Sequence, residues 1–145
     1  MNGFPPPEAL LPHGPAAVLL DAVTSGDASG AAATVRIRAD SPYGVAGRGV
    51  PAHVGLEYMA QTCGLFAGLE ARAAGRAVRV GYLLGTRNFS ASRAWFRPGE
   101  TLAVSARVVL REPEMAAFAC TISAAGETVA EAQLTVFQPA PEAAP

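Results

Sequence analysis

A single long apolar segment, residues 51–74, most constrains how this chain can fold. Proline opens the segment and Gly75 follows it, which is the asymmetry expected at the two ends of a helix. Its charged residues are Glu57, Glu70 and Arg72. A helix that is apolar nearly all round must be covered on most sides, and a sheet curled around it would provide that cover.

The segments on either side of this predicted helix have the patterns of β-strands. These patterns lie at residues 18–23, 34–38, 78–84, 88–92, 102–109, 117–123 and 129–137. A turn is expected at 25–27 and a loop at 40–50. Two strands, one helix and then a run of antiparallel strands predict an α+β fold, in which a curved antiparallel sheet wraps around one long central helix.

Composition narrows the class of protein. The 145 residues suffice for one domain with a substantial core, and no change in composition marks a second domain. Eleven arginines, with no lysine, balance twelve acidic residues, so the basic surface of a nucleic-acid-binding protein is not expected. No apolar run is long enough to span a membrane, and the N-terminus does not resemble a secretory signal. We therefore expect a cytoplasmic protein.

The single domain is expected to span residues 1–145, with loose proline-rich ends at about 1–9 and 139–145. Cys63 and Cys120 lie inside apolar stretches and lack the spacing of metal ligands. The sequence therefore predicts neither a disulfide framework nor a metal site, and no cofactor is expected.

A narrow polar line follows one face of the predicted helix. His53, Glu57 and Gln61 succeed one another at intervals of four residues, and Gly64 and Gly68 extend the same line. The line is thus polar toward its N-terminal end and bare toward its C-terminal end. Because glycine lets another chain approach closely, the bare part predicts contact with a backbone or a chain-like ligand.

The polar end of this line suggests acid catalysis. Glu57 has apolar sequence neighbours, and a buried carboxyl group without a cationic partner holds its proton more tightly, as a general acid requires. The free N–H groups at the helix start, from about Ala52 to Val54, could polarise a carbonyl group. The two together would suit chemistry beside a thioester carbonyl.

Each of these polar residues also has an ordinary structural interpretation. Glu57 could be a structural carboxylate that an arginine or backbone groups satisfy. His53 could cap the helix or lie on the surface, and His13 could be a plain loop residue. Gln61 could hydrogen-bond a neighbouring strand.

Three motifs resemble those of the 3-hydroxyacyl-acyl-carrier-protein dehydratases, in the order found in that family. The first is Leu-Pro-His at 11–13 with the Leu-Leu-Asp-Ala-Val run at 19–23, and the second is the segment 50–61, which contains Glu-x-Met-Ala-Gln. The third is Tyr-Leu-Leu-Gly at 82–85 followed by Phe-Arg-Pro-Gly-Glu-Thr-Leu at 96–102. The match covers about residues 10 to 110 and is most like the aryl-polyene type of dehydratase.

The resemblance implies a hotdog fold, a homodimer or a heterodimer with a related hotdog subunit, and active sites at the subunit interface. The implied reaction is dehydration of 3-hydroxyacyl thioesters, on acyl carrier protein or coenzyme A, to trans-2-enoyl thioesters in fatty-acid or polyketide-type synthesis. The acyl chain would enter a tunnel on the Gly64 and Gly68 side of the helix. Glu57 matches the catalytic acid of the family, and Gln61 matches the glutamine one turn later. The amide near Ala52 matches the one that holds the thioester carbonyl, although that position is usually glycine.

One departure from the family concerns the base. The catalytic histidine of the family lies in a loop fourteen residues before the glutamate, a position that Tyr43 occupies here. Tyr43 is therefore expected in the substrate-binding loop without the histidine's chemistry. The base must then be His13, which belongs to a family motif, or His53, which lies one turn before Glu57.

Two other functions compete with dehydration. A hotdog thioesterase uses a carboxylate on the central helix and needs no histidine. A non-catalytic subunit would pair with an active dehydratase or dock acyl carrier protein, for which Arg87, Arg93 and Arg97 offer positive charge.

Overall fold

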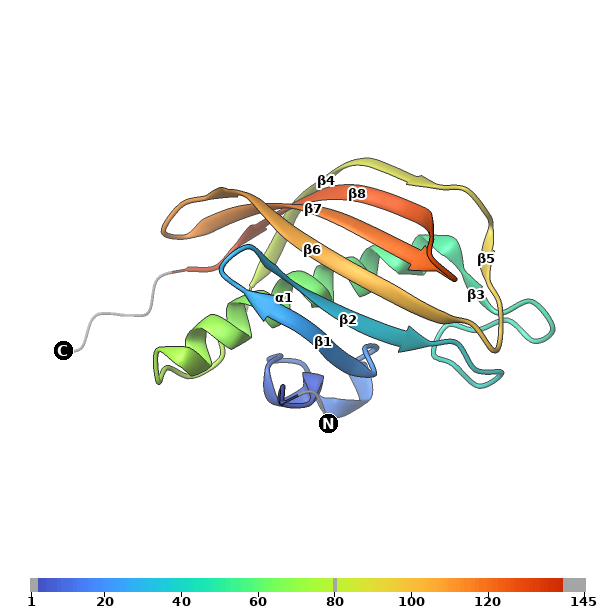
Figure 1. Ribbon diagram of the computed structural model, residues 1–145, viewed down its shortest axis with the longest axis horizontal. Coiled ribbons are helices and arrows are strands. Elements are labelled where there is room, and N and C mark those ends of the chain that lie inside the picture. The colour runs from blue at the N-terminus through green and yellow to red at the C-terminus, as the bar shows by residue number, and fades with distance from the viewer. Residues whose placement is uncertain (1–2, 80, 140–145) are drawn as a thin grey trace.

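A strongly curved sheet arches over a single long helix in the computed structural model, which describes residues 3–79 and 81–139 (Figure 1). The sheet has six antiparallel strands in the spatial order β1-β2-β6-β7-β8-β4. Their bounds are Ala22–Asp27 (β1), Gly30–Arg36 (β2), Tyr82–Ala91 (β4), Thr101–Arg111 (β6), Met115–Ala124 (β7) and Glu127–Phe137 (β8). The short strands β3 (Val50–Pro51) and β5 (Trp95–Phe96) form a separate pair. The predicted α+β hotdog fold is confirmed.

The central helix α1 (Gly55–Ala73) follows a 3-10 turn at Ala52–Val54, so the segment predicted at 51–74 is helical throughout almost all of its length. It ends where Gly75 adopts a φ of +68°. There the Gly75 N–H donates to the Arg72 carbonyl and the Arg76 N–H donates to the Ala71 carbonyl, at 3.1 and 2.7 Å. Glycine at this position lets the chain turn away without the strain that a side chain would add.

The core lies between α1 and the concave face of the sheet. Along β6 the residues Leu102, Val104 and Ala106 alternate with more exposed ones, and all three are at most 1% exposed. On α1, Met59 and Phe66 face the same interior, and Phe66 meets Phe118 of β7 edge to face at 5.6 Å between ring centroids. Apolar burial from both layers therefore holds the sheet against the helix.

Several segments differ from the sequence-based expectation, among them β2, which spans Gly30–Arg36 rather than 34–38. β1 begins at Ala22 rather than 18 and continues through the predicted turn at 25–27. A Cβ on Gly26 would lie 2.3 Å from the Leu69 side chain, so glycine serves close packing there rather than a turn. One strand, β4, which begins at Tyr82, takes the place of the two strands predicted at 78–84 and 88–92, and it has an irregular register between Arg87 and Ser90. Asn88 has a φ of +57° within this irregularity.

The described part of the N-terminal end is packed rather than loose. Residues Pro7–Ala9 form a 3-10 turn in which Pro7 is buried, and Phe4 packs against the core. The expected loose tail lies almost entirely outside the described residues. Within residues 3–79 and 81–139, no helix is both long and apolar enough to cross a membrane.

Candidate active site

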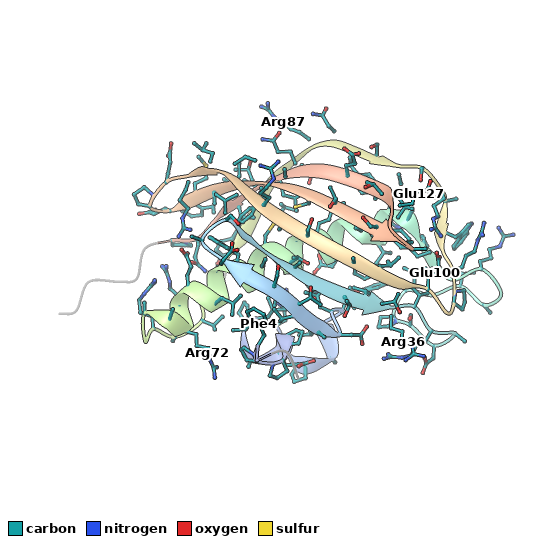
Figure 2. The ribbon with its side chains drawn as sticks, viewed as in Figure 1. Phe4, Arg36, Arg72, Arg87, Glu100 and Glu127 are labelled. Carbon is teal, nitrogen blue, oxygen red and sulfur yellow. The ribbon has the colours of Figure 1, made fainter. Side chains whose placement is uncertain are left out.

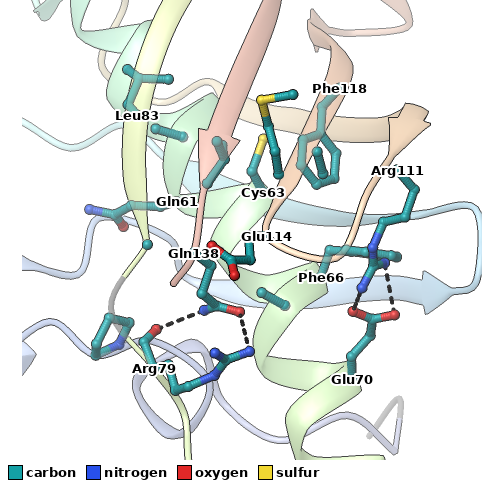
Figure 3. Close-up of a pocket in the computed structure, with 18 of the residues that line it drawn as sticks. Gln61, Cys63, Phe66, Glu70, Arg79, Leu83, Arg111, Glu114, Phe118 and Gln138 are labelled. Atoms are coloured by element: carbon teal, nitrogen blue, oxygen red, sulfur yellow. Dashed lines mark hydrogen bonds and ion pairs between the residues drawn. The ribbon is translucent and has the colours of Figure 1, made fainter. Parts of the chain in front are cut away.

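A cavity of about 220 Å³ follows one side of α1, and we call it the α1 groove (Figure 3). Its walls are α1, the N-terminal segment, the start of β4, the end of β8 and the turn between β6 and β7. The lining residues are Pro12, His13, Glu57, Ala60, Gln61, Cys63, Gly64, Phe66, Ala67, Glu70, Arg79, Gly81, Leu83, Arg111, Glu112, Pro113, Glu114, Met115, Ala116, Phe118, Val136 and Gln138. The groove thus brings His13 and Glu57 into one lining, together with apolar side chains from the middle of α1.

Gln61 fixes the carboxylate of Glu57. The Gln61 Nε2 donates to Glu57 Oε1 at 3.1 Å and to the Ala17 carbonyl at 2.9 Å. Its Oε1 accepts the N–H of Leu19 at 2.8 Å. Because Gln61 is only 1% exposed and is held at both ends of its amide, it presents a rigid donor to the carboxylate.

The structure brings some of the predicted site residues together and leaves others apart. His13, Glu57, Gln61 and Gly64 all line the α1 groove. The remaining predicted site residues, Ala52, His53, Val54, Gly68 and Tyr43, lie outside its lining.

The predicted residues that lie outside the groove are found in several different environments. His53 is exposed one turn before Glu57, and Tyr43 is 69% exposed on its loop with a φ of +64°. The Ala52 N–H donates to the Ala94 carbonyl at 2.9 Å, so the expectation of a free amide at that position is wrong. A Cβ on Gly68 would lie 2.2 Å from the Leu10 carbonyl oxygen. The bare helix surface at Gly68 is therefore covered by the chain's own backbone instead of a ligand.

The expectation that Glu57 is buried is also wrong for the single chain, in which this side chain is exposed. The reason is the distribution of the sheet around the helix. α1 packs against β1, β2, β6, β7 and β8, while β4 lies at the far edge of the sheet (Figure 1). At Glu57 the helix is consequently left uncovered by this chain, whereas Gln61, one turn later, is buried beneath the N-terminal segment.

The middle of the groove is apolar. Phe66 and Phe118 are 3% and 2% exposed, and Cys63 lies beside them (Figure 3). Burial, with a hydrogen-bonding contact to the Cys120 thiol at 3.8 Å, raises the pKa of Cys63 well above its usual value. A thiol in that state is a poor nucleophile, so this wall offers packing surface rather than chemistry.

The far end of the groove is charged, which the sequence did not predict. Arg111 of β6 forms an ion pair with Glu70 of α1, and Arg79 hydrogen-bonds Gln138 after β8 at 3.2 Å (Figure 3). These residues come from four separate segments, and no local spacing relates them. Among the described residues, no group of three His, Cys, Asp or Glu side chains is arranged to hold a metal ion.

A sheet wrapped around one helix, with a carboxylate and an imidazole on a groove beside that helix, places the chain among the hotdog-fold proteins. The ApeP-like family, described as ApeP dehydratase, matches residues 5–144. The chain belongs to this family. Membership confirms the predicted function in dehydration of 3-hydroxyacyl thioesters at the level of the family.

Solved structures support the same assignment. The dehydratase heterocomplex ApeI:P from Xenorhabdus doucetiae matches with a TM-score of 0.89 and 26% identity, over 94% of this chain and 93% of that chain. A hypothetical thioesterase from Streptococcus pneumoniae, solved with coenzyme A, matches with a TM-score of 0.61 and 16% identity, over 83% and 87% of the two chains. The Escherichia coli PaaI protein matches with a TM-score of 0.60 and 16% identity, over 79% and 80%. The last two show the fold alone. No curated protein matches the chain in sequence.

Proposed function

We propose that this chain is a catalytic subunit of a 3-hydroxyacyl thioester dehydratase, with Glu57 as the acid and His13 as the base. The observation that carries the proposal is that Glu57, oriented by Gln61, shares one groove with His13. His53 is disfavoured as the base because it lies outside the lining of that groove.

The two side chains account for both proton transfers of the elimination. The neutral imidazole of His13 removes a proton from C2 of the substrate, and the carboxyl group of Glu57 gives its proton to the departing C3 hydroxyl. The C2–H and C3–O bonds break, a C2–C3 double bond forms and water leaves. Proton return from the imidazolium to the carboxylate then restores the starting state.

The groove suits an acyl thioester whose chain lies along α1. Its middle is formed by small or apolar side chains, among them Ala60, Gly64 and Phe66, which favour a hydrocarbon chain. The thioester would lie at the Glu57 end, where the groove opens toward solvent and a carrier protein or coenzyme A could present it. Of the three arginines considered for carrier docking, Arg93 is occupied by an ion pair with Glu100, whereas Arg87 projects from β4 into solvent (Figure 2).

A hotdog partner would complete the site along β4. This strand is the last in the sheet, and Tyr82, Leu83 and Leu84 on it are 54%, 44% and 58% exposed. An unpaired edge with exposed apolar side chains favours association with another strand. Because Leu83 also lines the groove, a partner paired along β4 would lie beside Glu57 and shield it from water. The match to a dehydratase heterocomplex supports a related, non-identical partner.

The test measures conversion of a 3-hydroxyacyl carrier protein to its trans-2-enoyl form by the chain alone and by its complex with a hotdog partner. Glu57→Gln keeps the hydrogen bond from Gln61 within reach but removes the acid, so turnover should fall by about a hundredfold or more. Glu127→Gln at the start of β8 is the matched control and should retain full turnover (Figure 2).

Each other outcome contradicts a defined part of the proposal. Turnover by the complex that survives Glu57→Gln in this chain would make it a non-catalytic partner. Release of a free thiol without loss of water would make it a thioesterase. Full turnover after His13→Ala, with loss after His53→Ala, would exchange the roles of the two histidines.

A further inference from the structure

The α1 groove ends at an ion pair that lies far from Glu57. The helix rises by about 20 Å between Glu57 and Glu70, both of which line the groove. Glu70 receives two hydrogen bonds from Arg111, one of them from Nη1 to Oε2 at 2.8 Å and the other from Nη2 to Oε1 (Figure 3). The ion pair therefore joins α1 to the end of β6 across the groove.

Arg111 is held in one orientation by two independent contacts. Its guanidinium carbon lies 5.1 Å from the centroid of the Phe66 ring, while its nitrogen atoms contact Glu70. A planar guanidinium that both stacks on an aromatic ring and binds a carboxylate through two nitrogens is fixed in direction as well as in position. The Phe66 ring is thereby covered at the point where the apolar wall meets the charged end.

The change of wall chemistry at this point matters for a hydrocarbon. Along Ala60, Gly64 and Ala67 an alkyl chain meets small side chains and gains free energy as each methylene leaves water. At the ion pair it would have to displace water from Glu70 and Arg111, which are 39% and 48% exposed. Removing water from charged groups without providing new partners opposes further burial.

We propose that the Glu70–Arg111 ion pair is the end stop of the groove and sets the longest acyl chain that this subunit can bury. The proposal rests on the proposed function in one respect, namely that the groove holds an acyl chain. It assigns a specificity role to two residues that take no part in the proton transfers.

The test measures the affinity of the purified protein for saturated acyl-pantetheine thioesters of increasing length. While each added methylene is buried, affinity should rise about fourfold per carbon, the factor that corresponds to about 0.8 kcal/mol. In the wild-type protein this rise should stop at a defined length. In the double variant Glu70→Ala/Arg111→Ala the rise should continue to longer chains. Each single variant leaves one charged group at the end of the groove, which still opposes burial, so its limit should move less than that of the double variant.

Arg107→Ala is the matched control, since Arg107 is an exposed arginine on the same strand outside the groove. This variant should keep the wild-type limit. The proposal is overturned if the double variant keeps that limit, or if the wild-type protein shows no limit over the series.

Failure of the end stop and failure of the proposed function are distinguishable. A shifted length limit in a protein that does not dehydrate 3-hydroxyacyl thioesters, alone or with a partner, would retain the end stop and reject the dehydratase. Dehydration by a protein whose length limit is unchanged in the ion-pair variants would retain the dehydratase and reject the end stop.

Discussion

The two edges of the sheet are finished in opposite ways. Near the β1 edge, the N-terminal segment lies beside β1 and α1 (Figure 1), and Leu10 on this segment is fully buried. A Cβ on Gly68 of α1 would collide with the Leu10 carbonyl, so the backbones are in direct contact. At the β4 edge nothing in the described chain covers the strand, and a Cβ on Gly85 would meet no heavy atom within 4 Å.

This difference distinguishes contacts that stabilise the single chain from contacts that we expect a partner to make. The contacts of the N-terminal segment near β1 stabilise the fold, because they are made within one chain and persist in the monomer. The β4 edge adjoins the groove and carries the exposed apolar side chains, so we expect its contacts to be made with a partner chain. Substitutions on the first edge should change the free energy of unfolding, and those on the second should change the oligomeric state.

The largest expected effect comes from placing the same substitution at Gly68, where the N-terminal segment meets α1, and at Gly85 on the β4 edge. Gly68→Val forces the Leu10 carbonyl away from the helix and should lower the free energy of unfolding by about 3 kcal/mol. Gly85→Val places the same side chain into open space on a strand, where it should change the free energy by less than about 0.5 kcal/mol. Urea unfolding of the monomer measures both, and equal losses at the two positions would break the comparison.

A second expected effect concerns the hydrogen bonds that tie the N-terminal segment to α1. Gln61→Leu leaves the Leu19 N–H and the Ala17 carbonyl without their partner, and should cost about 2 kcal/mol of stability. It also releases the Glu57 carboxylate, so turnover should fall more than stability explains. Gln133→Leu, on the exposed side of β8, is the control for a glutamine without such contacts.

Denaturant midpoints and turnover at a temperature where both variants are folded separate the two effects of Gln61→Leu. A variant with normal turnover and reduced stability would show that Gln61 serves only the fold. A variant with normal stability would show that the N-terminal segment is held by apolar packing alone.

A third substitution addresses the β4 edge. Leu84→Asp puts a charge on a strand whose apolar side chains are expected to meet a partner, and it should weaken association by about tenfold or more. Monomer stability should not change, because Leu84 is 58% exposed. Leu110→Asp on β6 is matched in exposure, at 50%, and should leave association intact. Light scattering and co-purification with a hotdog partner report the result.

The same contrast explains which features could be read from the sequence. A long apolar segment between a proline and a glycine predicted α1, and apolar or alternating runs predicted the antiparallel strands, because both patterns result from burial inside one chain. The apolar neighbours of Glu57 also predicted that this side chain is buried, which is wrong, since such neighbours do not reveal whether the covering surface belongs to the same chain. The bare line ending at Gly68 predicts contact with a backbone or a chain-like ligand without distinguishing the two, and at Gly68 the Leu10 backbone makes that contact.

The groove was predictable at only one of its walls. Glu57, Gln61 and Gly64 share a helix face, and helical spacing relates them directly. The opposite wall, with Arg79 and Arg111, comes from segments that meet only because of strand order and the curvature of the sheet. No local pattern encodes such a meeting, so the charged end of the groove emerged from the structure alone.

The smallest expected effect lies beyond the end of β4, where Arg93 pairs with Glu100 in the turn between β5 and β6. Partial burial alone would raise the pKa of Glu100, but hydrogen bonds from the Arg93 guanidinium, at 2.6 and 2.8 Å, and from the Arg97 N–H outweigh it and lower the pKa below its usual value of 4.5. A carboxyl group whose pKa is lowered by folding stabilises the protein above its unfolded-state pKa. That stability is lost as the pH falls through the lower, folded-state value.

Glu100→Gln should therefore lower the free energy of unfolding at neutral pH by at most about 1 kcal/mol, since the ion pair lies near solvent and is screened. Below the folded-state pKa of Glu100 the variant and the wild-type protein should be equally stable. Urea unfolding at a series of pH values, with Glu127→Gln as the control, measures this convergence. A constant difference at every pH would mean that Glu100 acts through packing rather than through its charge, and that the end of the open edge is anchored without electrostatics.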